Sequence, residues 1–98
     1  MGMLHLVNKS PYDAGNLNTA AKIMKGGDEL LLIEDGVYSA MKNGKAAALL
    51  DGLKVSVLGP DLAARGIPED RLVDGVTVID YAGFVDLVEA NDKVQSWL

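Results

Sequence analysis

The residues best suited to chemistry are two adjacent carboxylates, Glu34 and Asp35, and a serine, Ser10, in the segment that holds the only histidine, His5. A pair of carboxylates can divide general acid and base work, and a serine beside a histidine can act as a nucleophile. Neither pattern is specific, because neighbouring loop residues need not face one atom and a Ser–His pair needs a third, orienting group. A small carboxylate-dependent hydrolase is therefore an alternative and not the main interpretation.

Structural roles are favoured for the same residues. Glu34 or Asp35 is expected to cap the helix that follows, where a carboxylate meets free backbone N–H groups. Ser10 precedes Pro11, and Ser-Pro is a common start of a turn. His5 lies in a short apolar run, which predicts a neutral, hydrogen-bonded core histidine.

The sequence contains no cysteine, which excludes disulfides, thiolate ligands, thiol nucleophiles and persulfide carriage by this chain. With a single histidine, a zinc site would need carboxylates for most of its ligands, so no metal is expected. The segment Asn43-Gly44-Lys45 lacks the spacing of a phosphate-binding loop and does not directly follow a predicted strand. No cofactor is therefore expected either.

Length and charge limit the number of domains and the classes of partner that the chain can have. The 98 residues suit one domain over 1–98, and a net charge of −5 disfavours direct binding to nucleic acid. No apolar run approaches the roughly 20 residues that span a bilayer, and no secretion signal is apparent, so a cytoplasmic protein is expected. Met1-Gly2 is either native or a remnant of cloning, since Met3 is an equally good start.

Hydrophobic spacing predicts the elements that position these residues. Short apolar runs indicate strands over residues 3–7, 29–33, 54–58 and 76–79. Helical spacing indicates helices over residues 15–25, 60–65 and 81–90, and two short helical pieces within 37–50. The alternation predicts a small Rossmann-like, three-layer α/β domain with a mostly parallel sheet of four to five strands. The pattern does not give the strand order, and residues from 91 onward read as a tail.

In open α/β sheets, ligands meet the loops that follow the carboxyl ends of the strands. The candidate site residues in these loops are Ser10, Pro11, Glu34, Asp35, Gly36, Asp61, Arg65, Asp80 and Tyr81. The aromatic residues predicted to lie in the core or at an interface are Tyr12, Tyr38, Tyr81, Phe84 and Trp97, with Trp97 the best candidate for cover by a partner. A mean hydropathy of +0.16 in so small a chain predicts an oligomer.

Four blocks carry a family resemblance that extends over residues 3–97. They are residues 3–11, which end in Ser10-Pro11, residues 27–37 (GDELLLIEDGV), residues 61–66 (DLAARG) and residues 79–85 (IDYAGFV). In order and spacing they resemble the DsrH/TusB family of sulfur-relay subunits. The resemblance implies a small α/β subunit that assembles with DsrE/TusD-like and DsrF/TusC-like proteins into a heterohexamer with two copies of each.

The resemblance also implies a function with two branches. TusB-like members serve thiolation of the wobble uridine of certain tRNAs, and DsrH-like members serve oxidation of stored sulfur. Sulfur-carrying members have a cysteine in the first helix, at the position of Ala20 here. Alanine cannot hold a persulfide, so the resemblance implies a non-catalytic, TusB-like subunit whose DsrE/TusD-like partner carries the cysteine.

Within this resemblance, Glu34, Asp35 and Arg65 are expected to cap or bridge local loops. The residues expected near subunit contacts are His5, Tyr38 and Trp97. In isolation the chain is expected to form a homo-oligomer, since an apolar partner-facing surface needs cover. A stand-alone, homo-oligomeric ligand-binding domain is the alternative to the relay subunit.

Overall fold

The computed structural model describes residues 2–11, 15–44 and 46–97, so Met1, Tyr12 and Lys45 of the sequence expectations lie outside the described residues. The strands are β1 (Met3–Val7), β2 (Glu29–Leu32), β3 (Lys54–Leu58), β4 (Thr77–Ile79) and β5 (Lys93–Trp97). The α-helices are α1 (Asn16–Ile23), α2 (Gly59–Ala64) and α3 (Tyr81–Ala90). The 3-10 helices are η1 (Glu34–Ala40), η2 (Ala47–Leu50) and η3 (Glu69–Arg71).

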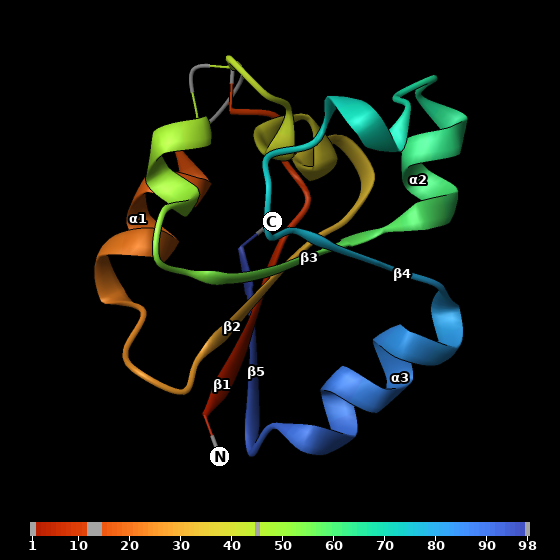
Figure 1. The fold of residues 1–98 in the computed structure, drawn as a ribbon. Coiled ribbons are helices and arrows are strands. Elements are labelled where there is room, and N and C mark those ends of the chain that lie inside the picture. Colours follow the sequence, from red (N-terminus) through yellow and green to blue (C-terminus); the bar gives the residue numbers. More distant parts are fainter. Residues whose placement is uncertain (1, 12–14, 45, 98) are drawn as a thin grey trace.

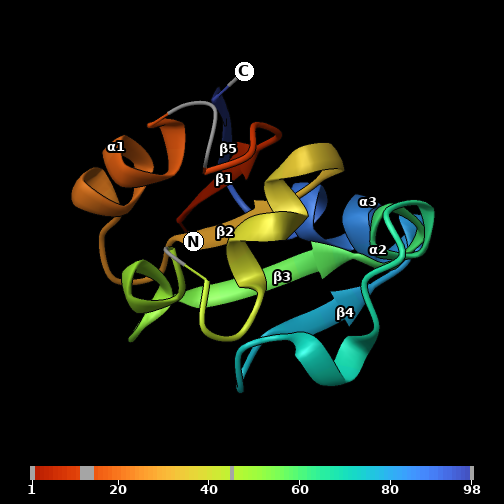
Figure 2. The same cartoon turned by 90° about the horizontal axis from the view of Figure 1, so that it is seen from above.

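The five strands form one parallel sheet in the order β4-β3-β2-β1-β5. Figure 2 shows β2, β3 and β4 side by side with their arrowheads at the same end, near α2. Parallel neighbours need crossover connections, and helices or loops supply them along the chain. The predicted small α/β domain with a parallel sheet is confirmed.

Two-sided burial of the central strands explains the apolar run in β2. Leu30, Leu31 and Leu32 are all fully buried. Leu30 and Leu32 belong to the main core, whereas Leu31 packs in a second, smaller cluster on the opposite face. A strand covered on both faces needs apolar residues at every position, which is typical of parallel sheets.

The two faces of the sheet are covered very unequally. The main core receives side chains from α1, α2, η1 and η2, among them Leu17, Leu62, Val37 and Leu50. The smaller cluster of Leu4, Leu6 and Leu31 meets α3 only through partly buried side chains, Phe84 and Leu87. Figure 1 shows α3 and η2 on opposite sides of β3. The helix α3 is therefore the thin third layer of the fold.

The segment from residue 91 is not a simple tail. Lys93–Trp97 forms β5, which pairs with β1 from Met3↔Lys93 to Val7↔Trp97. The hydrophobic pattern gives little sign of β5, because an edge strand is half solvated and four of its five residues are exposed. The fifth strand still falls within the predicted four to five.

The helical prediction for residues 37–50 is correct in part. The first piece begins earlier, at Glu34, and both pieces are 3-10 helices. Asn43 has a left-handed φ of 62°, which fits the predicted break at Asn43-Gly44. No described helix has the length and apolar character needed to cross a bilayer.

Candidate functional site

The loop after β2 is shaped by a close approach to β1. Gly36 lies against the end of β1, where a Cβ atom would collide with the carbonyl oxygen of Val7. Glu34, two residues earlier, has a left-handed φ of 49°, a conformation that costs a non-glycine residue about 1 kcal/mol or more. Only glycine at position 36 lets the chain turn this tightly over the sheet.

Polar contacts join this loop to the loops after β1 and β3. The Asn8 side-chain amide donates to Glu34 Oε1 at 3.3 Å, and the Glu34 backbone N–H donates to Asp61 Oδ2 at 2.6 Å. Arg65 Nε donates to Asp35 Oδ1 at 2.9 Å and forms an ion pair with it. The predicted bridging of loops by Glu34, Asp35 and Arg65 is therefore present, with Asn8 and Asp61 as further members.

The structure also bears on the other interpretations of the two carboxylates. No side chain caps η1, whose N-cap position is Ile33, so the capping interpretation of Glu34 and Asp35 is wrong. The two carboxylates contact different partners, Glu34 the Asn8 amide and Asp35 the Arg65 guanidinium. The hydrogen bond with Asp35 raises the pKa of Arg65 above its already high usual value, so Arg65 stays a cation.

A second polar network lies where β1 meets β5 and the loop before β2. His5 is 1% exposed and its Nε2 lies 3.2 Å from Asp28 Oδ2. Trp97 Nε1 donates to His5 Nδ1 at 3.1 Å. Because Nδ1 accepts this bond, the proton of a neutral imidazole is on Nε2 and faces Asp28. The prediction of a hydrogen-bonded core histidine is confirmed.

Asp28 is the anchor of this network. Its Oδ1 accepts the backbone N–H of Met3 at 2.9 Å, and its Oδ2 accepts that of Lys25 at 3.1 Å. These hydrogen bonds, with that of Met3 the largest cause, lower the pKa of Asp28 below its usual value against an opposing effect of burial. Since both nitrogens of His5 already have partners, His5 is not available as a base for Ser10, which is itself buried.

The remaining predicted residues do not gather at one point. Asp80 caps α3, accepting the Gly83 backbone N–H at 2.8 Å. Tyr81 is 61% exposed, and the half-buried Tyr38 packs against the main core. Pro11 is also half-buried. Ala20, the position implied for the family cysteine, is fully buried in the main core.

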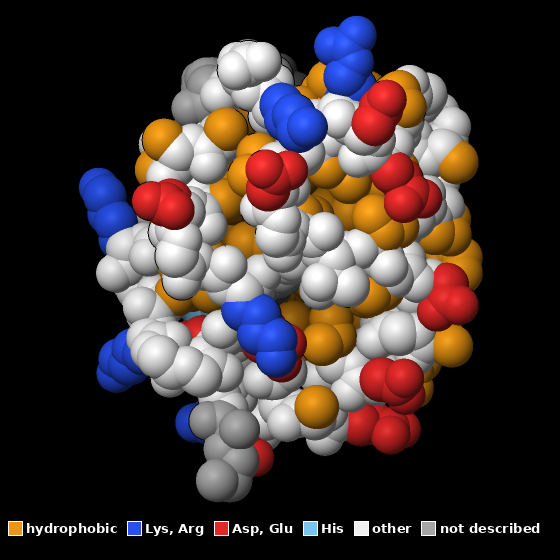
Figure 3. All heavy atoms as spheres, in the orientation of Figure 1, with side chains coloured by type: hydrophobic (Ala, Val, Ile, Leu, Met, Phe, Trp, Pro, Cys, Tyr) orange, Lys and Arg blue, Asp and Glu red, His pale blue; other side chains and the backbone are white. Residues whose placement is uncertain are grey.

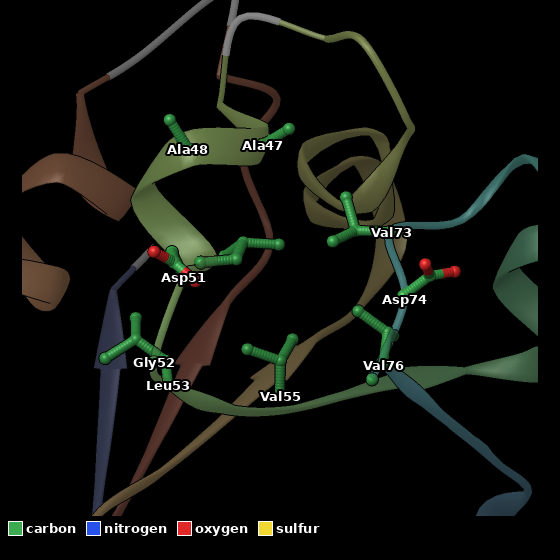
Figure 4. Close-up of a pocket in the computed structure, with 11 residues that line it drawn as sticks. Ala47, Ala48, Asp51, Gly52, Leu53, Val55, Val73, Asp74 and Val76 are labelled. Carbon is green, nitrogen blue, oxygen red and sulfur yellow. The ribbon is translucent and has the colours of Figure 1, made fainter.

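One cavity adjoins the second network: it measures about 460 Å³, and His5, Asp28, Met3 and Lys25 are among its lining residues. A hollow of about 580 Å³ lies between η2 and the chain before β4, lined by Leu50, Val55, Val73 and Val76. Figure 4 shows the Asp51 and Asp74 carboxylates at its margins, and no predicted site residue is among its described lining residues. Among the residues that the structure describes, no three His, Asp or Glu side chains are grouped to hold a metal.

Sequence reasoning missed Asp28 and Asn8 as members of the two networks. Asp28 follows Gly26-Gly27 and starts the approach to β2, so in a parallel sheet it lies beside the beginning of β1. That placement is a usable signal, because β1 carries the only histidine. The two networks join segments that are distant in the sequence to one another.

Comparison with known proteins shows the family of the chain. The family model described as "DsrH like protein" matches residues 9–94. Curated relatives from Photorhabdus laumondii subsp. laumondii and Pectobacterium parmentieri, both named Protein TusB, are 36% identical over 97 residues, covering 97% of this chain and 100% of each relative. The ychN protein from E. coli shares the fold, with a TM-score of 0.81 at 19% identity over 98% of both chains. Protein Tm0979 from Thermotoga maritima has a TM-score of 0.69 at 28% identity, over 90% of this chain and 92% of its own.

Proposed function

The chain belongs to the DsrH-like protein family and is TusB-like, and from this premise we propose that it is a non-catalytic subunit of a cytoplasmic sulfur-relay complex. The complex would pass persulfide sulfur toward 2-thiolation of the tRNA wobble uridine. The observation that carries the non-catalytic role is the lack of any cysteine in a chain that matches full-length TusB proteins. A persulfide needs a thiolate both as nucleophile and as carrier.

The partners in this proposal are a DsrE/TusD-like protein, which carries the reactive cysteine, and a DsrF/TusC-like protein, in a heterohexamer with two copies of each. A net charge of −5 leaves contact with tRNA to other components. The loop network around Arg65 and the core network around His5 support this role, because both stiffen the chain without offering a nucleophile. Tyr38 and Trp97, both half-buried, are proposed to lie near subunit contacts.

Native mass spectrometry of the three proteins, co-expressed from one source, tests the assembly. A complex with two copies of each supports the proposal, and a chain that stays apart from both partners overturns it and favours the ligand-binding alternative. Incubation with a radiolabelled persulfide donor tests the chemistry. Label is expected on the DsrE/TusD-like subunit and none on this chain.

A deletion strain separates the two branches of the family. Loss of 2-thiouridine from tRNA digests, restored by this chain, supports the thiolation role. A normal level of 2-thiouridine together with impaired oxidation of stored sulfur would instead assign the chain to the DsrH-like branch. If an unrelated acidic protein also reverses the defect of the deletion strain, both functional assignments are contradicted.

A further inference from the structure

The helix α3 presents apolar side chains on two sides. Phe84 and Leu87 pack against the smaller core cluster. On another side, Tyr81, Val85 and Val88 are 61%, 55% and 39% exposed, and their spacing of i, i+4 and i+7 places them in one stripe. No residue of α3 is buried. A surface helix of a monomer normally has a single apolar stripe, and packing within the described part of the chain does not account for the second, exposed one.

The charged residues of α3 and of the positions that flank it, from 80 to 92, have a single sign. Between residues 80 and 92 the carboxylates are Asp80, Asp86, Glu89 and Asp92, and this stretch contains no Lys or Arg. In Figure 3, acidic and hydrophobic side chains are interspersed over α3, and the Lys and Arg side chains visible on that face lie elsewhere. The nearest cation in the sequence is Lys93, at the start of β5.

This charge pattern indicates which kind of protein the exposed stripe of α3 can bind. In a two-fold contact between copies of this chain, each stripe would meet its own copy and acidic rims would oppose one another. Like charges across an interface disfavour association, whereas opposite charges favour it. We propose that the α3 surface, made of Tyr81, Val85 and Val88, binds a different protein that presents an apolar patch surrounded by Lys and Arg. That this protein is a relay partner rests on the proposed function.

The test uses two double variants and a matched control in the full chain. Val85→Ser/Val88→Ser removes the apolar character of the stripe. Asp86→Lys/Glu89→Lys, the rim variant, reverses the charge at two exposed positions beside it. Ile23→Ser is the control, because Ile23 is 49% exposed but lies at the end of α1. Each variant's circular dichroism and Tm are compared with those of the wild type. If the serine variant fails to fold, the rim variant alone decides the outcome.

Binding to the co-expressed relay partners is expected to weaken at least tenfold in both double variants and to stay within twofold in the control. Unchanged binding in folded double variants, with assembly intact, overturns the inference and leaves the proposed function standing. Self-association of the wild-type chain that the serine variant abolishes would show a second copy as the occupant and also overturn it.

A second probe does not depend on the relay partners. A synthetic amphipathic helix with leucines flanked by lysines should bind the wild type, and a twin with glutamates should not. The rim variant should reverse this preference, which a structural role of these side chains would not produce. If the relay proteins do not assemble but this pattern holds, the proposed function fails and the inference stands. Equal binding of both peptides overturns it.

Discussion

Trp97 donates its indole N–H to Nδ1 of His5 at 3.1 Å, and the two rings lie 6.2 Å apart at 19°. This side-chain contact links β5 to β1 in addition to the backbone pairing of the two strands. On the far side of the ring, Asp28 fixes the orientation of the imidazole. The three side chains therefore act as one structural unit.

Trp97→Phe should destabilise the protein by about 1–3 kcal/mol, because the buried Nδ1 of His5 loses its donor while most of the aromatic contact remains. Urea unfolding followed by circular dichroism measures the change. Tyr81→Phe is the control, since Tyr81 is 61% exposed and its change should stay within about 0.5 kcal/mol. Equal effects of the two variants would contradict a role for the indole N–H.

The stability should fall in acid through Asp28. Folding lowers the pKa of Asp28 below its usual value of 3.8. The Asp28 carboxylate therefore adds to the free energy of unfolding at a pH above its pKa in the unfolded chain, and this addition is lost as the pH falls through its pKa in the folded chain. Asp28→Asn should therefore be less stable than the wild type at pH 7, and this difference should shrink below about pH 4. Chemical unfolding from pH 7 to pH 3 measures it, with Asp86→Asn, at an exposed position, as the control. A difference that is constant with pH would refute the assignment.

Gly36→Ala should destabilise the fold by about 3 kcal/mol or more, because the new Cβ meets the backbone of Val7 and neither strand end can move freely. Gly26→Ala is the matched control, since nothing lies within 4 Å of the added atom there. Thermal unfolding of both variants distinguishes a steric conflict from a general effect of replacing glycine. Similar Tm values would show that the loop after β2 can relax.

The Asp35–Arg65 pair should contribute little stability. Asp35 is 55% exposed, and exposed ion pairs are typically worth about 0–1 kcal/mol. A double-mutant cycle with Asp35→Asn and Arg65→Gln should give a coupling energy below about 1 kcal/mol that falls further in high salt. The hydrolase alternative predicts instead that Asp35→Asn abolishes an activity and leaves stability and assembly unchanged.

The local hydrophobic pattern predicts some elements of this fold, whereas other elements and contacts depend on how distant segments pair. The runs at β1 and β3 stand out because both strands are buried, and their predicted bounds are those observed. Lys93–Trp97 carries no such run, since at the edge of the sheet it is exposed. Glu34 and Asp35 suggest helix caps, yet their partners come from other loops that no short-range pattern brings near. The link from Trp97 to His5 joins distant parts of the chain and depends on the strand order.

The position of β5 also governs what happens when the chain partly opens. β5 covers the edge of β1, a strand whose last four residues are all buried. If β5 detaches, β1 becomes an apolar edge with free backbone donors and acceptors, which is a template for pairing with another chain. We therefore expect the hydrogen bond from Trp97 to His5 to limit aggregation and strand exchange, so that weakening it shows first as misassembly at high concentration.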